Sequence, residues 1–194
     1  MARQGRVLVD NGVYHIISRG HNRHKLFHFL DDYNIYKKII IEYKTLFEFN
    51  IFHYCFMPNH IHLLLRVKNG FELPKIMQEI NQSYSRHYKR AYLLVGNVFQ
   101  GRYKGLFIDK DGYLLECGRY IERNPLRVRM TEDPSEYHFS SYNFYAKGRK
   151  DDIITTNPLY IELSQDPVER MKLYREYLLK ERPYEQILDY RLKI

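Results

Sequence analysis

The sequence predicts an α+β fold with a ferredoxin-like core, in which strands and helices follow one another as β-α-β-β-α-β. Two observations predict it. Short apolar runs of β-prone residues alternate with longer segments whose apolar residues recur every three or four positions. Residues 50–67, NIFHYCFMPNHIHLLLRV, also predict a tight hairpin, because Pro58-Asn59 separates two apolar runs. We expect an antiparallel sheet with helices on one face, an additional helix and a C-terminal helical extension.

The first half of the core is predicted to contain a strand, a helix and then the hairpin. Residues 13–19 have the continuous apolar centre that is typical of a buried central strand. After a basic, histidine-containing loop at residues 20–25, a helix is expected from residue 31 to about residue 49. Its first turn is acidic, and its tyrosine and isoleucine residues recur at helical spacing. The hairpin at 50–67 then supplies the second and third strands.

The second half of the core follows the same logic. Residues 71–92 predict a helix with one apolar side, Gly96-Asn97 interrupts it, and residues 102–109 predict the fourth strand. A third helix is expected from about Asp111 to Arg123, because Pro125 disfavours a helical conformation in the residue before it.

The two sides of this third helix differ in polarity. Tyr113, Glu116, Cys117, Tyr120 and Asn124 share one side, and Leu114, Gly118 and Ile121 lie on the other. The spacing therefore assigns the packing side to residues other than Tyr120. We expect residues 1–130 to form the core domain with this helix. Residues 131–194 are expected to form an extension on or beside the core, with a linker after residue 146 and a charged helix at about 166–182.

Composition limits the classes of function. The 194 residues carry a net charge of +8, and such a basic domain indicates a polyanionic partner. The two cysteines, Cys55 and Cys117, match no disulfide or metal-knuckle spacing and favour a reducing, cytoplasmic location. No run of about 18 apolar residues is present, so no membrane partner is expected.

His60 and His62 in the hairpin are candidates for a metal site. Residues two apart on a strand point to the same face, about 7 Å apart. Burying both imidazoles unpaired would cost roughly 1–3 kcal/mol each, and a shared cation removes that cost. No thiolate is nearby in sequence, so an oxygen ligand would complete a site for Mg²⁺ or Mn²⁺. The alternative is two hydrogen-bonded structural histidines.

The third helix offers further polar groups. The Tyr120 phenol and the Asn124 amide are one turn apart, about 6 Å along the helix axis. Each has an ordinary alternative, since Asn124 suits a helix end before Pro125 and tyrosine is abundant, with 19 copies. Periodicity alone indicates only a partly polar face.

Four segments resemble the single-tyrosine HUH transposases, most closely the REP-associated tyrosine transposase branch. They are YHIISRGHNR, FHYCFMPNHIHLLL, FQGRYKG and YIERNPLR, and the resemblance covers about residues 8–146. It implies that His60 and His62 bind a divalent metal ion, that Tyr120 is the nucleophile and that Asn124 is the third metal ligand. Two positions depart from the branch: Phe99 replaces a usual tryptophan, and Glu122-Arg123 replaces a more apolar pair.

The implied function is a metal-dependent endonuclease and strand transferase. Tyr120 would attack a phosphodiester and form a 5′-phosphotyrosine intermediate on single-stranded DNA that contains a hairpin. The metal, Mg²⁺ or Mn²⁺, is the sole cofactor expected, with no small-molecule cofactor. Association with the nucleoid is expected while DNA is bound. The oligomeric state stays open between monomer and homodimer, with Tyr120 acting in cis or in trans.

Basic residues supply candidate phosphate contacts, although each alone also suits an ordinary solvated surface. These candidates are Arg19, Arg23, Lys25, Arg86, Lys89, Arg90, Arg102, Lys104 and Arg127. Two other functions remain as alternatives. One is a non-catalytic nucleic-acid-binding protein of the same fold, and the other is a metal hydrolase that uses the histidine pair and water in place of Tyr120.

Overall fold

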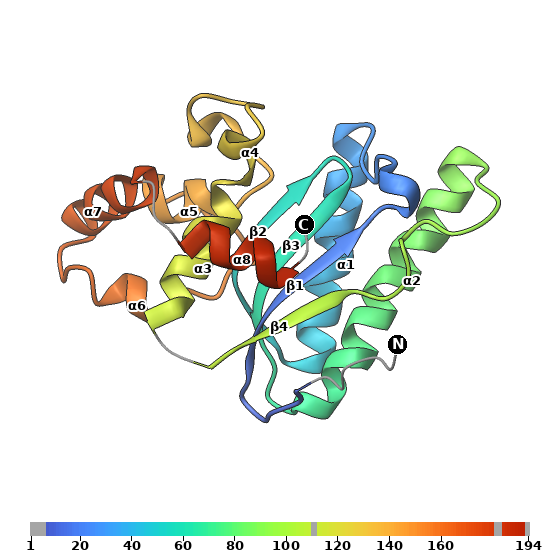
Figure 1. Ribbon diagram of the computed structural model, residues 1–194, viewed down its shortest axis with the longest axis horizontal. Helices are drawn as coiled ribbons and strands as arrows, with labels where there is room; N and C mark the ends of the chain where they lie inside the picture. The colour runs from blue at the N-terminus through green and yellow to red at the C-terminus, as the bar shows by residue number, and fades with distance from the viewer. Residues whose placement is uncertain (1–6, 110–111, 181–183, 193–194) are drawn as a thin grey trace.

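A four-stranded antiparallel sheet forms the centre of the molecule (Figure 1). The computed structural model describes residues 7–109, 112–180 and 184–192. The strands are β1 (Val13–Arg19), β2 (Asn50–Met57), β3 (His60–Arg66) and β4 (Lys104–Ile108), in the order β2-β3-β1-β4. This order, with two helices between the strands, confirms the predicted ferredoxin-like core.

The two central strands, β1 and β3, position the hairpin histidines. The pairing of β1 with β3 places Arg19 opposite His60 and Ile17 opposite His62. The hairpin turns at Pro58-Asn59, with Met57 opposite His60. Because both faces of the sheet are covered, β1 and β3 are buried through their centres, which explains their continuous apolar sequences.

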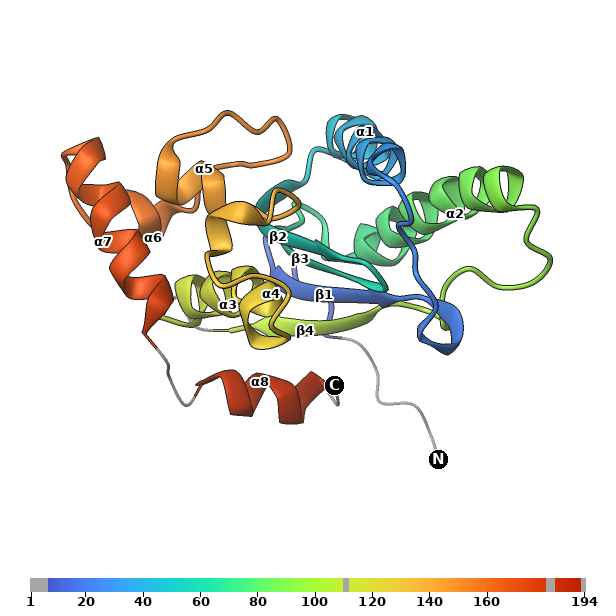
Figure 2. The ribbon, with the colours of Figure 1, turned by 90° about the horizontal axis from the view of Figure 1, so that it is seen from above.

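Two helices cover one face of the sheet, α1 (Leu30–Phe47) and α2 (Leu73–Tyr92), as Figure 2 shows. Short 3₁₀ turns, η1 (His21–Arg23) and η2 (Gly70–Glu72), precede them. The Asp32 carboxylate accepts hydrogen bonds from the backbone N–H groups of His28 and Phe29 at 2.8 and 3.0 Å, which caps the start of α1. The apolar sides of both helices pack on the sheet and form the main core.

Helix α3 (Gly112–Glu122) lies on the opposite face of the sheet (Figure 2). The predicted start at Asp111 lies outside the described residues. Helix α3 ends at Glu122, but Asn124 is still helical, since it begins a second, four-residue helix, α4 (Asn124–Arg127). Pro125 lies in the first turn of α4, where its missing N–H is not needed.

The predicted packing side of α3 is incomplete, because Leu114 and Ile121 are buried as expected but the side predicted to be partly polar is buried as well. Tyr120 is 1% exposed and Cys117 is fully buried, as is Ile121 on the other side. The physical reason is that α3 is covered on both sides, by the sheet on one and by C-terminal helices on the other. A helix with two buried sides shows no clean division between an apolar and a polar face.

The C-terminal part adds a 3₁₀ turn and four further helices. They are η3 (Pro134–Glu136), α5 (Tyr142–Lys147), α6 (Pro158–Ile161), α7 (Pro167–Leu179) and α8 (Tyr184–Leu192). The charged helix expected at 166–182 corresponds to α7, and residues 181–182 lie outside the described residues. The division into a core and an extension at residue 130 stays a prediction.

The segment expected to be a linker and the residues on either side of it are bound to the edge of β2. The Phe56 and Thr155 backbone N–H groups donate to Phe139 and Ile51 carbonyls at 2.9 and 2.7 Å. The Tyr54 hydroxyl donates to the Asp151 carboxylate. These bonds cover a strand edge that would otherwise present unpaired backbone groups.

A buried polar network joins α3 to the C-terminal helices. The Glu122 carboxylate accepts a hydrogen bond from the Tyr174 hydroxyl at 2.8 Å, contacts His53 Nδ1 at 2.8 Å and accepts from the Ser141 hydroxyl. Asn157 Nδ2 contacts the other His53 ring nitrogen at 2.9 Å. All five side chains are fully buried. The polar Glu122 thus has a structural role that attaches α3 to residues far along the chain.

Candidate active site

Three histidine rings from the two central strands lie together at the face of the sheet that α3 covers. The rings of His60 and His62 have centroids 4.9 Å apart. His62 Nδ1 lies 2.9 Å from Nε2 of His15, which comes from β1. His60 Nδ1 lies 2.7 Å from the side-chain oxygen of Asn59 in the hairpin turn. The strand geometry therefore brings the predicted pair together and adds a third imidazole.

Burial keeps these imidazoles neutral at pH 7. It lowers the pKa of His15 to about 3. Burial, followed by the nearby charge of Arg19, lowers the pKa of His60 to about 4. The pKa of His62 is lowered well below its usual value, by burial and then by neighbouring groups, the first being His60. A neutral imidazole has one nitrogen lone pair, which is the form that binds a metal ion.

One nitrogen of His62 has no protein partner. Its Nε2 atom is buried and makes no hydrogen bond within the described residues. When His62 Nδ1 carries the proton of the bond to His15, Nε2 presents its lone pair to this unpartnered position. A buried imidazole nitrogen without a partner is uncommon in folded proteins, and it is an atom at which a metal ion or a water molecule could bind.

Tyr120 extends from α3 toward this cluster. Its ring centroid lies 5.7 Å from that of His15 and 6.0 Å from that of His62. The Tyr120 hydroxyl donates a 2.8 Å hydrogen bond to the Asp189 carboxylate of α8. Burial, followed by this hydrogen bond, raises the pKa of Tyr120 well above its usual value, and the nearby Arg127 opposes the rise. In this state the phenol is protonated.

Asn124 lies one turn beyond Tyr120 and is turned toward its own helix. Its Nδ2 donates to the backbone carbonyls of Tyr120 at 2.9 Å and Ile121 at 3.1 Å. The amide nitrogen is therefore occupied, and the amide oxygen is the atom that a cation would use. Within the described part of the chain, no group of three or more His, Cys, Asp or Glu side chains is arranged as a complete metal site.

Helix α8 covers Tyr120 through a row of ion pairs. Arg119, Arg123 and Arg127 are four residues apart on α3 and α4, and acidic residues of α8 face them. Glu185 lies 2.7 Å from Nε of Arg123, and Asp189 pairs with Arg127. The Arg127 guanidinium also lies over the Tyr120 ring, 4.9 Å from its centroid. Tyr120 is 1% exposed, so its phenol is closed to solvent in this structure, with α8 lying against it.

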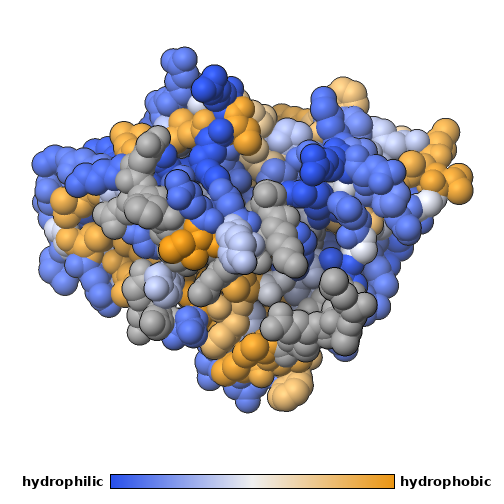
Figure 3. Space-filling model, viewed as in Figure 1, coloured by the Kyte–Doolittle hydropathy of each residue, from blue (hydrophilic) through white to orange (hydrophobic). Residues whose placement is uncertain are grey.

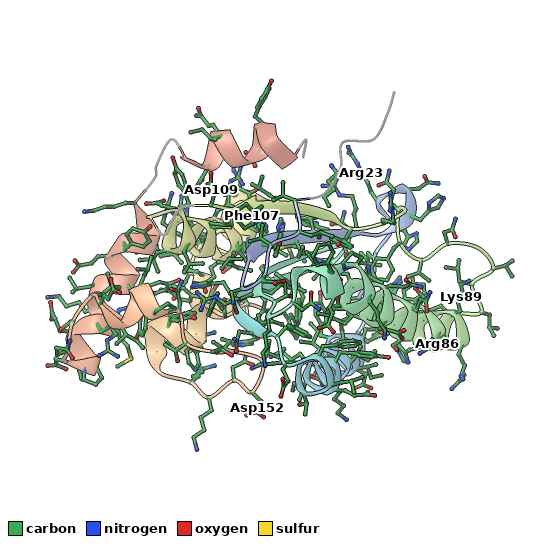
Figure 4. All side chains as sticks on the ribbon, turned by 90° about the horizontal axis from the view of Figure 1, so that it is seen from below. Arg23, Arg86, Lys89, Phe107, Asp109 and Asp152 are labelled. Carbon is green, nitrogen blue, oxygen red and sulfur yellow. The ribbon has the colours of Figure 1, made fainter. Side chains whose placement is uncertain are left out.

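The predicted phosphate contacts fall into several places. Arg19, Arg23 and Lys25 line one cavity of about 540 Å³ together with His60. Lys89 and Arg102 line a second cavity, between α2 and the loop that follows it. Arg127 lies at Tyr120, while Arg86, Arg90 and Lys104 are exposed and line neither cavity. Figure 4 shows Arg86 and Lys89 near the same end of α2, away from Arg23.

Sequence reasoning missed two groups at the site. One is His15, whose ring lies within hydrogen-bond distance of His62 but whose place in the first strand does not reveal this contact. The other is Asp189, which accepts the Tyr120 hydrogen bond. A signal for it existed, because Glu185 and Asp189 repeat the four-residue spacing of Arg119, Arg123 and Arg127 with the opposite charge.

Comparisons with known proteins identify the family and the fold. A family model described as "Transposase IS200 like" matches residues 8–124. A REP-associated tyrosine transposase solved with a REP hairpin superposes with a TM-score of 0.66 at 19% identity, over 81% of this chain and 93% of that one. At this identity the likeness concerns the fold.

Two further structures match more loosely. One is a protein from Deinococcus radiodurans R1 described as a transposase, with a TM-score of 0.44, 18% identity and coverage of 71% of this chain and 98% of that one. The other is tRNA(His) guanylyltransferase from Saccharomyces cerevisiae, with a TM-score of 0.41, 10% identity and coverage of 99% and 82%. No curated protein matches the sequence. Among the helices of the described residues, none has the length and apolar character needed to cross a membrane.

Proposed function

This chain belongs to the IS200-like transposase family, and from that premise we propose that it is a metal-dependent single-stranded DNA endonuclease and strand transferase. It acts on DNA that contains a hairpin and forms a 5′-phosphotyrosine intermediate. The observation that carries this proposal is the position of Tyr120, whose ring lies 6.0 Å from that of His62. A tyrosine beside a pair of neutral imidazoles is suited to phosphoryl transfer with a bound cation.

The residues at the site fit a divalent metal ion. His60 and His62 are neutral and adjacent, and His62 Nε2 is buried without a partner among the described residues. Their pKa values, lowered by burial, make proton competition for these nitrogens weak at pH 7. The Asn124 amide oxygen would be the third protein ligand. Bound there, Mg²⁺ or Mn²⁺ would polarise the scissile phosphate and stabilise its developing negative charge.

The protein residues have distinct roles in the reaction. The Tyr120 oxygen attacks phosphorus, the bond from phosphorus to the 3′-oxygen breaks, and the DNA 5′-phosphate stays on the tyrosine. The proton that Tyr120 gives up is balanced by the proton that the departing 3′-oxygen takes up. Arg127, which lies over the Tyr120 ring, favours the phenolate as this proton leaves. The reverse attack by a 3′-hydroxyl rejoins DNA without ATP.

A covalent-adduct assay tests the proposal. The protein is incubated with labelled single-stranded hairpin DNA and Mg²⁺ or Mn²⁺, and the products are separated on a denaturing protein gel. We expect a protein–DNA adduct from the parent chain, loss of the adduct in Tyr120→Phe, and at least a hundredfold slower adduct formation in His60→Ala. Tyr113→Phe on the same helix and His138→Ala on the surface are matched controls that keep the activity.

The outcomes separate the alternatives. An adduct formed by Tyr120→Phe would show that another residue is the nucleophile. DNA cleavage by the parent with no adduct would favour a metal hydrolase that uses water. Salt-sensitive binding of the hairpin with neither cleavage nor adduct, even at high Mn²⁺, would favour a non-catalytic nucleic-acid-binding protein.

A further inference from the structure

We propose that the cavity between α2 and the following loop binds one unpaired nucleotide of the DNA substrate, at a distance from Tyr120. The cavity has a volume of about 480 Å³, within the usual range of ligand pockets. It lies on the α2 side of the sheet, whereas the histidines lie on the α3 side. The inference rests on the proposed function only in assuming that single-stranded DNA is the ligand.

Amide side chains dominate the polar lining of this cavity. Gln78, Asn81 and Gln82 follow one side of α2, and Asn97 faces them from the loop. Each amide offers both a donor and an acceptor, which is the pattern needed to read the mixed edge of a nucleobase. Carboxylates are absent from the described lining of the cavity, so nothing there repels the phosphate attached to the base.

Asn81 has an unused hydrogen-bonding atom. Its Nδ2 donates to the Ser18 hydroxyl of β1 at 3.2 Å, which fixes the side chain. Its Oδ1 is buried and has no hydrogen-bond partner among the described residues. A buried acceptor of this kind favours a ligand with a donor, such as the exocyclic amine of adenine or cytosine.

Aromatic and cationic groups complete the features of a nucleotide site. Phe99 and Tyr103 form part of the wall, and aromatic rings are the usual surfaces on which unpaired bases stack. Lys89 and Arg102 lie at the same cavity and can bind the flanking phosphates. Beside it, Leu93 and Val95 on the loop are 87% and 96% exposed. Figure 3 shows hydrophobic surface at the right edge, where this loop lies in Figure 1.

The backbone connects this cavity to the one at His60. Residues 98–100 run beside the end of β1: His21 N–H donates to the Val98 carbonyl at 2.9 Å, and Gln100 N–H donates to the Arg19 carbonyl at 2.8 Å. Arg19 in turn lines the cavity that contains His60. A DNA strand held at one cavity therefore passes the end of β1 to reach the other.

Binding measurements without metal test this inference independently of cleavage. A labelled hairpin with a single-stranded flank is titrated by fluorescence anisotropy against the parent, Asn81→Leu and Gln82→Met. Both substitutions replace an amide by a neutral side chain of similar size, so the net charge is unchanged. We expect each variant to bind the flanked hairpin about tenfold more weakly and a blunt hairpin as well as the parent does. Glu79→Gln on α2, which does not line the cavity, should match the parent.

A coupled experiment locates the nucleotide. An abasic site is placed at each position of the single-stranded flank in turn. At one position it should weaken binding by the parent about tenfold, and at that same position it should not weaken binding by Asn81→Leu any further. Equal binding of the flanked hairpin by the parent and both variants would overturn the inference. So would an equal loss for flanked and blunt hairpins, or a change in sedimentation that assigns the cavity to a second copy of this chain. Because Gln82 is exposed, Gln82→Met should fold normally and keeps the test informative even if Asn81→Leu does not fold.

The two proposals fail separately. Loss of binding in the cavity variants without any adduct in the parent would retain this inference and reject the phosphotyrosine reaction. An adduct that depends on Tyr120, with unchanged binding in the cavity variants, would retain the phosphotyrosine reaction and reject the nucleotide site.

Discussion

Among single residues, His15 links the site to the stability of the fold. It is fully buried and lies against His62 and Tyr120. Its pKa is about 3 when folded, against about 6.5 when unfolded, so the unfolded chain binds this proton first as the pH falls. The free energy of unfolding therefore decreases as the pH drops from about 6.5 toward 3, and the full stability is present only above this window.

We predict that this loss is measurable in urea denaturation. Between pH 7 and pH 5, the parent should lose about 2 kcal/mol more of its unfolding free energy than His15→Phe, because the variant has no imidazole to protonate at that position. His138→Ala, which removes an exposed histidine, should lose as much as the parent. Equal losses in the parent and His15→Phe would contradict the prediction.

At this scale the sequence points to the residues of the candidate site but not to the contacts between them. The pair His60 and His62 is recognisable from a two-residue spacing next to a turn, because strand geometry fixes their common face. The bond between His15 and His62 depends on how two strands pair, and Asp189 depends on where a distant helix packs. Neither is determined by local sequence.

At the scale of elements, α8 lies against Tyr120, and in the proposed reaction it would control access to the phenol. Asp189 accepts the phenolic hydrogen bond, and its charge would repel an arriving phosphate. We predict that Asp189→Ala increases the initial rate of adduct formation about tenfold, since it removes one charged hydrogen bond from the ground state. The rate is measured by quantifying adduct on denaturing gels at early times.

A second substitution on α8 serves as the control for Asp189→Ala. Gln186→Ala, an exposed change on the same helix, should leave the rate unchanged. A chain that ends at Lys180 should be at least as fast as Asp189→Ala. A slower rate in both altered chains would instead show that Asp189 accepts the tyrosine proton during the reaction.

The elements of the core are predicted well because their signals are local. The stripe Tyr33, Tyr36, Ile40 and Tyr43 faces the sheet, as the spacing indicates, since α1 has one buried side. The same method fails for α3, which is buried on two sides. It also fails for α4 and α6, each of four residues, because a single helical turn contains too few residues to establish a period.

At the scale of the whole molecule, one chain contains every group of the proposed site. Tyr120 lies beside His62 of the same chain, which supports action in cis. We predict that mixing Tyr120→Phe with His60→Ala gives no more adduct than either variant alone, at any ratio and at protein concentrations from about 1 to 50 μM. Restored adduct in the mixture would show that a second copy donates its tyrosine helix.

The buried Glu122 network has a consequence for attempts to shorten this enzyme. The matched family segment ends at residue 124, but Glu122 is held by Tyr174 and Ser141, which lie well beyond it. A fragment cut at residue 130 would remove two of the partners of this carboxylate together with α5 and α7, the helices that carry them. The smallest working unit for engineering therefore extends through α7, even though its recognisable motifs end fifty residues earlier.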